Sequence, residues 1–249
     1  FPGEMPERRR YCLAMMSAID DGVGRIQETL RKHVIKENTF ENQRGTSIGL
    51  SRQEELVFRD NTIHNESAYA LNADYLNRAS FTGNRIRSGG VYQYPVKFGA
   101  NADTTLIANN FFICRETTNG AVSLSGTRYI FVHNSVVSSG TGFNAALWIA
   151  ADDKLIFNNI LVNEEQGNAL YISPGFSNNV LDYNCYHVPE GGYIASESYA
   201  TLAEWQTASG QDAHSIDVKP LFASENDLHT FSRLRSEERR VGKECATGC

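Results

Sequence analysis

Apolar and polar positions follow a pattern that the chain repeats seven times. Each copy centres on an asparagine, with an apolar residue three positions before it and another two positions after it. The asparagines are Asn38, Asn61, Asn84, Asn110, Asn134, Asn159 and Asn184, at intervals of 23, 23, 26, 24, 25 and 25 residues. A fixed period of about 20–30 residues is typical of a solenoid. We therefore expect a stack of coils.

Each coil is expected to consist of short strands. Apolar and polar residues alternate with a period of two around each asparagine, as in a strand with one buried face. A second alternation precedes the asparagines by ten to fifteen residues, at 47–50, 96–98, 122–124, 147–149 and 170–172. A leucine-rich repeat has a similar length, but it would carry Leu at most core positions and no aromatic column. The pattern thus predicts an all-β chain with an asparagine at a bend of every coil.

The arrangement resembles the right-handed parallel β-helix of the pectin-lyase-like superfamily, in which each strand pairs in register with its copy in the next coil. Stacked asparagine side chains then form hydrogen bonds along the ladder, as amides do in other in-register stacks. We interpret the seven asparagines as scaffold rather than as catalytic residues.

The end of the chain carries the sharper part of the resemblance. The segments 181–186, 202–205, 210–215 and 220–222 resemble the closing segment of bacterial right-handed β-helix repeat proteins, many of which are secreted and occur in polysaccharide-degrading systems. The similarity covers residues 31–222 as architecture. It implies an extracellular or cell-surface location, and it implies that Trp205 and His214 are closing residues rather than catalytic ones.

Four regions follow from these patterns. Residues 1–30 form an N-terminal edge that we expect to be truncated, because the chain starts with neither an initiator Met nor a hydrophobic segment. Residues 31–187 form the coils, and 188–231 form the closing segment. A short capping helix is expected at 199–206, with Ser196 or Ser198 as its N-cap. Residues 232–249 have no coil period and are expected to be a non-native tail.

The composition of the chain limits the classes of partner that it can bind. The net charge of −6 and the pI near 5.6 argue against nucleic acid or an anionic membrane surface. No apolar run approaches the ~18 residues of a membrane span. The five cysteines are odd in number and share no metal-like spacing with the histidines, so we expect no metal site made by these residues. We expect a monomer whose partner is a polysaccharide.

One sheet is expected to present its outward residues as a surface that matches an extended polymer. The offsets place one column at Gly49, Asn72, Lys97, Ser123, Trp148 and Tyr171, and a second at Ser51, Asp74, Gly99, Ser125, Ala150 and Ser173. Asn72, Trp148 and Tyr171 are therefore predicted to bind substrate, the two rings as a sugar-stacking platform. The alternative is that a loop covers these rings, and the loop 88–95 brings Tyr92 and Tyr94 as either a groove wall or such a cover.

Lys97 is the basic residue of the first column. β-Helix polysaccharide lyases use Lys or Arg to take the proton α to a uronate carboxyl group, while Ca²⁺ or another cation neutralises that carboxylate. The resemblance therefore implies Lys97 as the catalytic base, Asp74 as its catalytic neighbour one coil away, and Ca²⁺ as an accompanying cation. The alternative, an ordinary solvated lysine, stays open.

Hydrolysis instead needs two carboxylates, roughly 5–10 Å apart. Asp103 and Asp152 share one offset before their ladder asparagines and lie two coils apart, roughly 10 Å. They are predicted to bind substrate, with polar turn residues as the alternative. The motifs of polygalacturonases are absent, which disfavours that family.

These patterns favour cleavage of a uronic-acid polysaccharide by a lyase over hydrolysis. Two alternatives remain: a non-catalytic glycan-binding or adhesive surface solenoid, or an inactive fragment of a larger enzyme. Fold alone does not decide among them.

Overall fold

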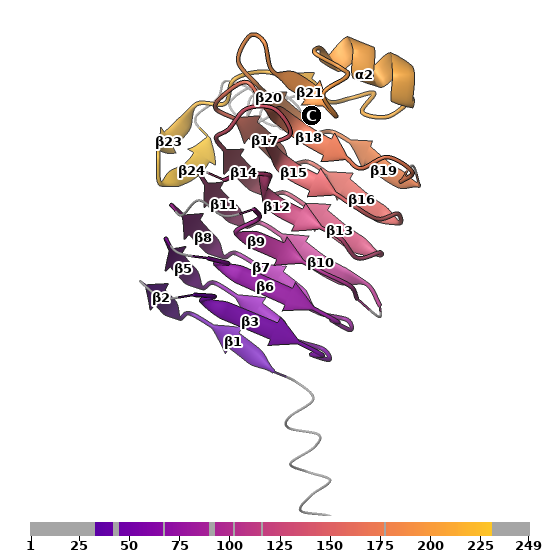
Figure 1. Ribbon diagram of the computed structural model, residues 1–249. Coiled ribbons are helices and arrows are strands. Elements are labelled where there is room, and N and C mark those ends of the chain that lie inside the picture. The colour runs from indigo at the N-terminus through magenta and orange to yellow at the C-terminus, as the bar shows by residue number, and fades with distance from the viewer. Residues whose placement is uncertain are drawn as a thin grey trace, which may run out of the picture.

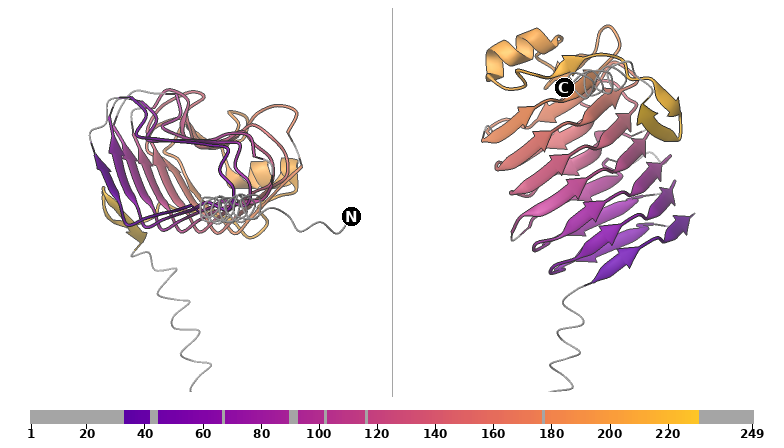
Figure 2. Two further views of the ribbon diagram at one scale, coloured as in Figure 1. Left: turned by 90° about the horizontal axis from the view of Figure 1, so that it is seen from below. Right: turned by 180° about the vertical axis from the view of Figure 1, so that it is seen from behind.

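The computed structural model describes residues 33–41, 45–66, 68–89, 93–101, 103–115, 117–176 and 178–230. In this part the chain winds into a parallel β-solenoid whose coils each contribute one strand to each of three sheets (Figure 1). Seen along the axis, the three sheets enclose one interior (Figure 2). The expected all-β solenoid is confirmed. The N-terminal edge at 1–30 and the tail at 232–249 lie outside the described residues.

We name the sheets A, B and C in the order in which a coil visits them. Sheet A contains β1 (Val34–Lys36), β4 (Val57–Arg59), β7 (Ser80–Thr82), β10 (Thr105–Ala108), β13 (Tyr129–Val132), β16 (Lys154–Phe157) and β19 (Asn179–Asp182). Sheet B contains β2 (Thr39–Glu41), β5 (Thr62–Asn65), β8 (Arg85–Ser88), β11 (Phe111–Cys114), β14 (Ser135–Ser138), β17 (Ile160–Asn163), β20 (Cys185–His187) and β22 (Ile216–Asp217). Sheet C contains β3 (Ile48–Ser51), β6 (Leu71–Asp74), β9 (Val96–Phe98), β12 (Gly120–Leu124), β15 (Ala145–Ile149), β18 (Asn168–Ile172) and β21 (Tyr193–Ala195).

Register follows the sequence repeat. The apolar residue three before each ladder asparagine pairs with its copy in the next coil, as Phe58 does with Phe81 and Phe131 with Ile156. Inward-facing residues therefore stack on like residues, and the Phe58 and Phe81 rings lie 5.4 Å apart. Together they form one continuous buried core along the axis. Burial of this column is the main favourable term for folding.

The asparagine ladder lies at the bend between sheets A and B. Asn134 is buried, and its Nδ2 donates to the carbonyl of Ile107 at 2.9 Å and to Oδ1 of Asn159 at 3.2 Å. Its Oδ1 accepts the backbone N–H of Asn110 at 3.0 Å. Each ladder asparagine from Asn61 to Asn159 repeats this set of bonds with its neighbours. The ladder thereby satisfies backbone groups that the bend would otherwise bury without partners.

The residue before each ladder asparagine has a left-handed backbone. Positive φ, between 55° and 68°, occurs at Glu37, Asp60, Gly83, Asn109, His133, Asn158 and Tyr183. Only one of the seven is glycine, so most coils adopt this strained conformation with a side chain present, at a cost of about 1–2 kcal/mol each. The ladder bonds hold the bend in this conformation.

The closing segment continues the ladder with different residues. Asn184 has no asparagine above it; its Nδ2 donates to Oδ1 of Asp212 at 3.1 Å, and its N–H donates to Oγ of Ser215 at 2.8 Å. The buried Asp212 carboxylate also accepts bonds from the Tyr186 hydroxyl and from Trp205 Nε1, the latter at 2.8 Å. Trp205 thus has a structural contact that fits its expected place in the closing segment.

Helix α2 (Leu202–Ser209) begins three residues later than the sequence predicted, and neither Ser196 nor Ser198 is its N-cap. Thr201 caps it instead: its hydroxyl accepts the N–H of Glu204 at 3.3 Å, and the Glu204 carboxylate accepts the N–H of Thr201 at 3.0 Å. This reciprocal capping box satisfies two free donors at once, which a lone serine does not. Ser196 is held elsewhere, by Ile172 of sheet C.

A hairpin of β23 (Phe222–Ser224) and β24 (Asp227–Thr230) folds back over the outer face of sheet B. Leu228 is buried there against Ile113, Val137 and Val162, each an outward residue of a different coil. The hairpin therefore shields an apolar stripe on the outside of the solenoid. In the part of the chain that the structure describes, no helix is long and apolar enough to cross a bilayer.

We predict that Asn134→Ala lowers the free energy of unfolding by about 3 kcal/mol or more, because it leaves several buried donors and acceptors unpaired at ~1–3 kcal/mol each. Urea unfolding measures this change. Asn38→Ala is the matched control, because Asn38 occupies the same repeat position but is exposed; it should cost less than ~1 kcal/mol. Equal losses for the two variants would contradict the proposed role of burial.

Candidate functional site

The outward residues of sheet C form the two columns that the sequence predicted. Strand pairing places Gly49 beside Asn72, Asn72 beside Lys97, Lys97 beside Ser123, Ser123 beside Trp148, and Trp148 beside Tyr171. Five neighbouring strands, β6 to β18, thus present one continuous line of side chains. The line is polar at β6 and β9 and aromatic at β15 and β18.

Four rings gather at the aromatic end of this line. The Trp148 and Tyr171 rings are stacked with centroids 4.0 Å apart and an interplanar angle of 23°. Tyr94 meets Trp148 edge to face at 5.5 Å, and Phe143 meets Tyr171 in the same way at 5.9 Å. Phe143 is the most open of them, with 59% of its surface exposed. We call these four residues the aromatic cluster.

The packing within the aromatic cluster limits which ring faces a sugar could stack on. Because Trp148 and Tyr171 stack on each other, one face of each ring is covered by the other ring. Tyr94, from the loop 88–95, packs against the Trp148 ring, so this loop tyrosine covers the rings of sheet C. Tyr92 lies outside the described residues. Burial raises the pKa of Tyr94, opposed by a hydrogen bond from Asn119. The exposed Phe143 is then the ring best placed to stack on a ligand.

Lys97 lies between Asn72 and Ser123 on β9 and is half-buried. Within the described residues, no carboxylate lies within 4.0 Å of its ammonium, so Lys97 forms no ion pair there. Its charge is thus available to an anionic group that approaches sheet C. A cation without a carboxylate partner is what anion binding by this residue requires.

Asp74 does not approach Lys97 as its sequence position suggested. Its Oδ1 accepts the N–H of Tyr75 at 3.1 Å, and the carboxylate lies over the backbone of Gly99 in the next coil. A Cβ atom at Gly99 would come within 2.3 Å of that oxygen, so only glycine leaves room for this placement. The structure therefore brings Lys97 together with Asn72 and Ser123, and it directs Asp74 toward the corner of the coil.

Asp103 and Asp152 occupy the corner between sheets C and A, two coils apart as expected. Oδ1 of Asp103 accepts the N–H of Thr104 at 2.7 Å, and Oδ1 of Asp152 accepts the N–H of Asn178 at 2.9 Å. Each carboxylate thus has a backbone partner in its own turn or in the next coil. They lie beside the sheet C surface rather than on it.

Sequence reasoning missed Lys154, which is 1% exposed inside the same corner. Its Nζ donates to the carbonyls of Ala151 at 2.6 Å and Asp152 at 3.3 Å. Burial lowers its pKa to about 8, although the charges of Asp152 and Asp153 act in the opposite direction. Lys154 occupies the same repeat position as Tyr129, which faces inward, and this shared position is the sequence signal that Lys154 is buried.

Calcium, the cation implied by the resemblance, takes about six to eight oxygen ligands. Across the described ranges, no group of three or more His, Cys, Asp or Glu side chains is close enough to hold a metal ion. The described side chains therefore do not fit a calcium site built from the protein alone.

With this geometry established, the chain can be placed in a class. A family model described as "Right handed beta helix region" matches residues 29–206, which is more than half of the chain. The protein belongs to this right-handed β-helix family, and the architecture is consistent with the pectin-lyase-like superfamily. Searches among curated proteins and among solved structures gave no match. Family membership supports a polysaccharide-related or surface-solenoid role.

We predict that Lys154 makes stability depend on pH. Between pH ~8 and ~10.5 the unfolded chain binds more protons than the folded one at this residue, so the free energy of unfolding rises with pH. Relative to Lys154→Met, the wild-type protein should gain roughly 1–3 kcal/mol across this range. Urea unfolding at several pH values tests this. The quantity to follow is the free energy of unfolding of the wild-type protein minus that of Lys154→Met. If this value stays constant or falls as pH rises, the buried cation is contradicted.

Proposed function

We propose that this protein binds an extended, acidic polysaccharide along the outer face of sheet C. The observation that carries the proposal is the unbroken line from Asn72 to Tyr171, which runs along the solenoid axis on five paired strands. Four steps of ~4.8 Å give the line a length of about 19 Å, which suits several residues of an extended polymer.

Each part of the line supports a different contact. Lys97 supplies a positive charge for a carboxylate, and the half-buried Asn72 supplies hydrogen-bonding groups beside it, whereas Ser123 on the other side is only 4% exposed. The exposed Phe143 supplies an apolar ring at the other end. A positive charge at one end and an aromatic ring at the other suit a charged sugar chain. A peptide strand fits less well, because each strand from β6 to β18 is already paired on both sides.

We predict that Phe143→Ala weakens binding of a uronic-acid polymer about 3- to 10-fold, the usual worth of an exposed aromatic contact. Isothermal titration with polygalacturonate, alginate and a glucuronan measures the affinity. Tyr183→Ala is the control, because Tyr183 is equally exposed but lies at the bend between sheets A and B. Failure of all three polymers to bind would overturn the proposal, as would equal losses for both variants.

A second function, cleavage by β-elimination, is favoured by the place of Lys97 within the line, where no described carboxylate pairs with it. The neutral amine of Lys97 would take the proton α to the uronate carboxyl group. The electron pair then forms a carbon–carbon double bond as the glycosidic C–O bond breaks, and the leaving oxygen takes a proton from water. In this account a carboxylate bound near Asn72 places the acidic carbon beside the amine.

We predict that Lys97→Ala abolishes formation of unsaturated uronate ends, followed by their ultraviolet absorbance, while the polymer still binds with a lower affinity. Lys219→Ala, which removes an exposed lysine from the closing segment, should leave product formation unchanged. If the wild-type protein forms no such ends from any of the three polymers, the protein is a binding solenoid. If Lys97→Ala retains the full rate, Lys97 is not the base.

A further inference from the structure

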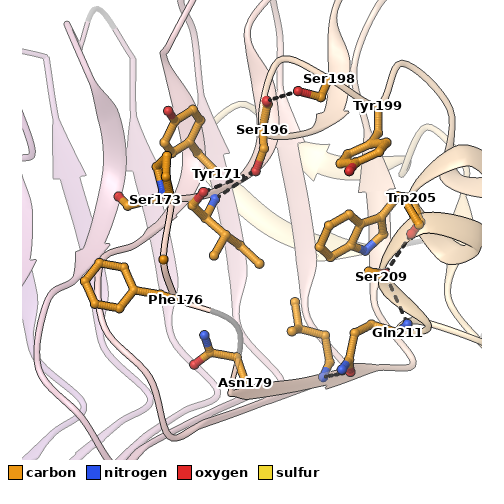
Figure 3. A pocket seen from close by; sticks show the side chains of 15 residues that line it. Tyr171, Ser173, Phe176, Asn179, Ser196, Ser198, Tyr199, Trp205, Ser209 and Gln211 are labelled. Carbon is orange, nitrogen blue, oxygen red and sulfur yellow. Dashed lines mark hydrogen bonds between the residues drawn. The ribbon is translucent and has the colours of Figure 1, made fainter.

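A cleft of about 520 Å³ lies at the C-terminal end of the coils, between β18, the loop 173–176, β19 and helix α2 (Figure 3). Binding clefts for small ligands typically measure ~300–1,000 Å³. Its lining combines rings with uncharged polar groups: Tyr171, Ser173, Phe176, Asn179, Tyr199, Trp205 and Gln211. Of the described residues that line the cleft, none carries a charge.

The floor of the cleft holds a buried donor that has no partner. Asn179 is 3% exposed, and its Oδ1 accepts the N–H of Lys154 at 3.1 Å. A backbone N–H only donates, so this contact fixes the amide oxygen toward Lys154 and directs the NH₂ group away from it. Nδ2 has no hydrogen-bond partner among the described residues. Figure 3 shows this side chain at the floor of the cleft, facing its interior.

Gln211 presents a second oriented amide. Its Oε1 accepts the N–H of Leu181 at 3.1 Å, which fixes that oxygen in the same way. No described residue accepts a bond from its Nε2. Ser173 adds a third donor, because its Oγ accepts Trp148 Nε1 at 3.1 Å and keeps its own hydrogen free. The cleft is therefore rich in donors and suits a ligand that is rich in oxygen acceptors.

Aromatic rings form the walls. Trp205 is 7% exposed, and its bond to Asp212 fixes the indole so that the ring lines the cleft. Tyr199 lies beside it, with centroids 5.5 Å apart (Figure 3). Flat rings beside oriented amide donors match a sugar, which has an apolar ring face and oxygens around its rim.

We propose that this cleft binds the end of the polysaccharide chain whose length lies along sheet C. The inference rests on the proposed function. Tyr171 ends the first column of sheet C and Ser173 ends the second, and both also line the cleft. The polymer surface thus leads directly into it. Helix α2 stands on the far side of the cleft and limits it there, so that a chain end fits better than a continuing chain (Figures 1 and 3).

The two tryptophans of the sequence allow a direct test, because Trp148 lies on sheet C and Trp205 lies in the cleft. In a Trp148→Phe background, Trp205 is the remaining tryptophan, and its fluorescence reports on the cleft. The probes are polygalacturonate, alginate and a glucuronan, and trimers to hexamers cut from whichever of these binds. We expect saturable changes in emission. At equal mass, shorter chains contain more chain ends. The mass of sugar needed for half-saturation should therefore fall as the chains shorten, in inverse proportion to the number of ends per unit mass.

Gln211→Glu keeps the acceptor for Leu181 and removes the free donor, and it should weaken the Trp205 response at least tenfold. Gln166→Glu makes the same charge change at an exposed glutamine that bonds Glu190 outside the cleft, and it should have no effect. If polymer binding is sensitive to Phe143→Ala but Trp205 emission does not change, the cleft is not the end subsite and the proposed function stands. Equal effects of the two glutamate variants also overturn the inference. Absence of binding by any probe overturns both proposals.

Discussion

The structure depends on keeping each coil in register with the next, and the buried asparagine ladder enforces that register. From Asn61 to Asn159, every ladder amide bonds both the coil before it and the coil after it, as Asn134 does, so a shift by one residue would break a bond at each end. The same bonds hold a left-handed residue at each bend, most often one with a side chain. Burial of the stacked apolar residues supplies most of the favourable free energy of folding. The ladder selects the one register of the strands in which these residues stack on their copies.

Register also determines what the outer surface can do. In a parallel stack, residues at one position of the repeat form a line along the axis, so a column of side chains becomes a continuous surface of nanometre length. The same geometry places neighbouring aromatic residues face to face, which is why Trp148 stacks on Tyr171. Free ring faces then come from residues outside the strands, such as Phe143, or from the end of the stack.

The end of the stack is where the repeat leaves groups without partners. Asp212 and Ser215 replace the next asparagine and satisfy Asn184. Among the described residues, no equivalent replacement reaches Asn179 at the other end of β19, and its amide nitrogen has no hydrogen-bond partner there. The closing segment thus supplies hydrogen-bond partners for the asparagine ladder but not for Asn179. This leaves an unpaired buried donor in the terminal cleft.

Much of this could be predicted from sequence because it follows from periodicity. The asparagine intervals fixed the coils, and fixed offsets placed Lys97, Trp148 and Tyr171 in one column, which strand pairing confirms. Non-periodic features were less accessible. The start of helix α2 depended on a local choice of caps, and the direction of the Asp74 carboxylate depended on the space above Gly99. The cleft joins elements that share no repeat position, so no sequence pattern indicates it.

The central claim is that the outer face of sheet C binds an acidic polysaccharide, and hydrogen–deuterium exchange with and without bound polymer tests it most directly. Binding should slow exchange in the segments that carry this face and its loops, at 71–74, 93–98, 120–125, 143–150 and 168–176, and should leave exchange in the strands of sheets A and B unchanged. Protection confined to sheet A or sheet B, or spread evenly over the coils, would contradict the account.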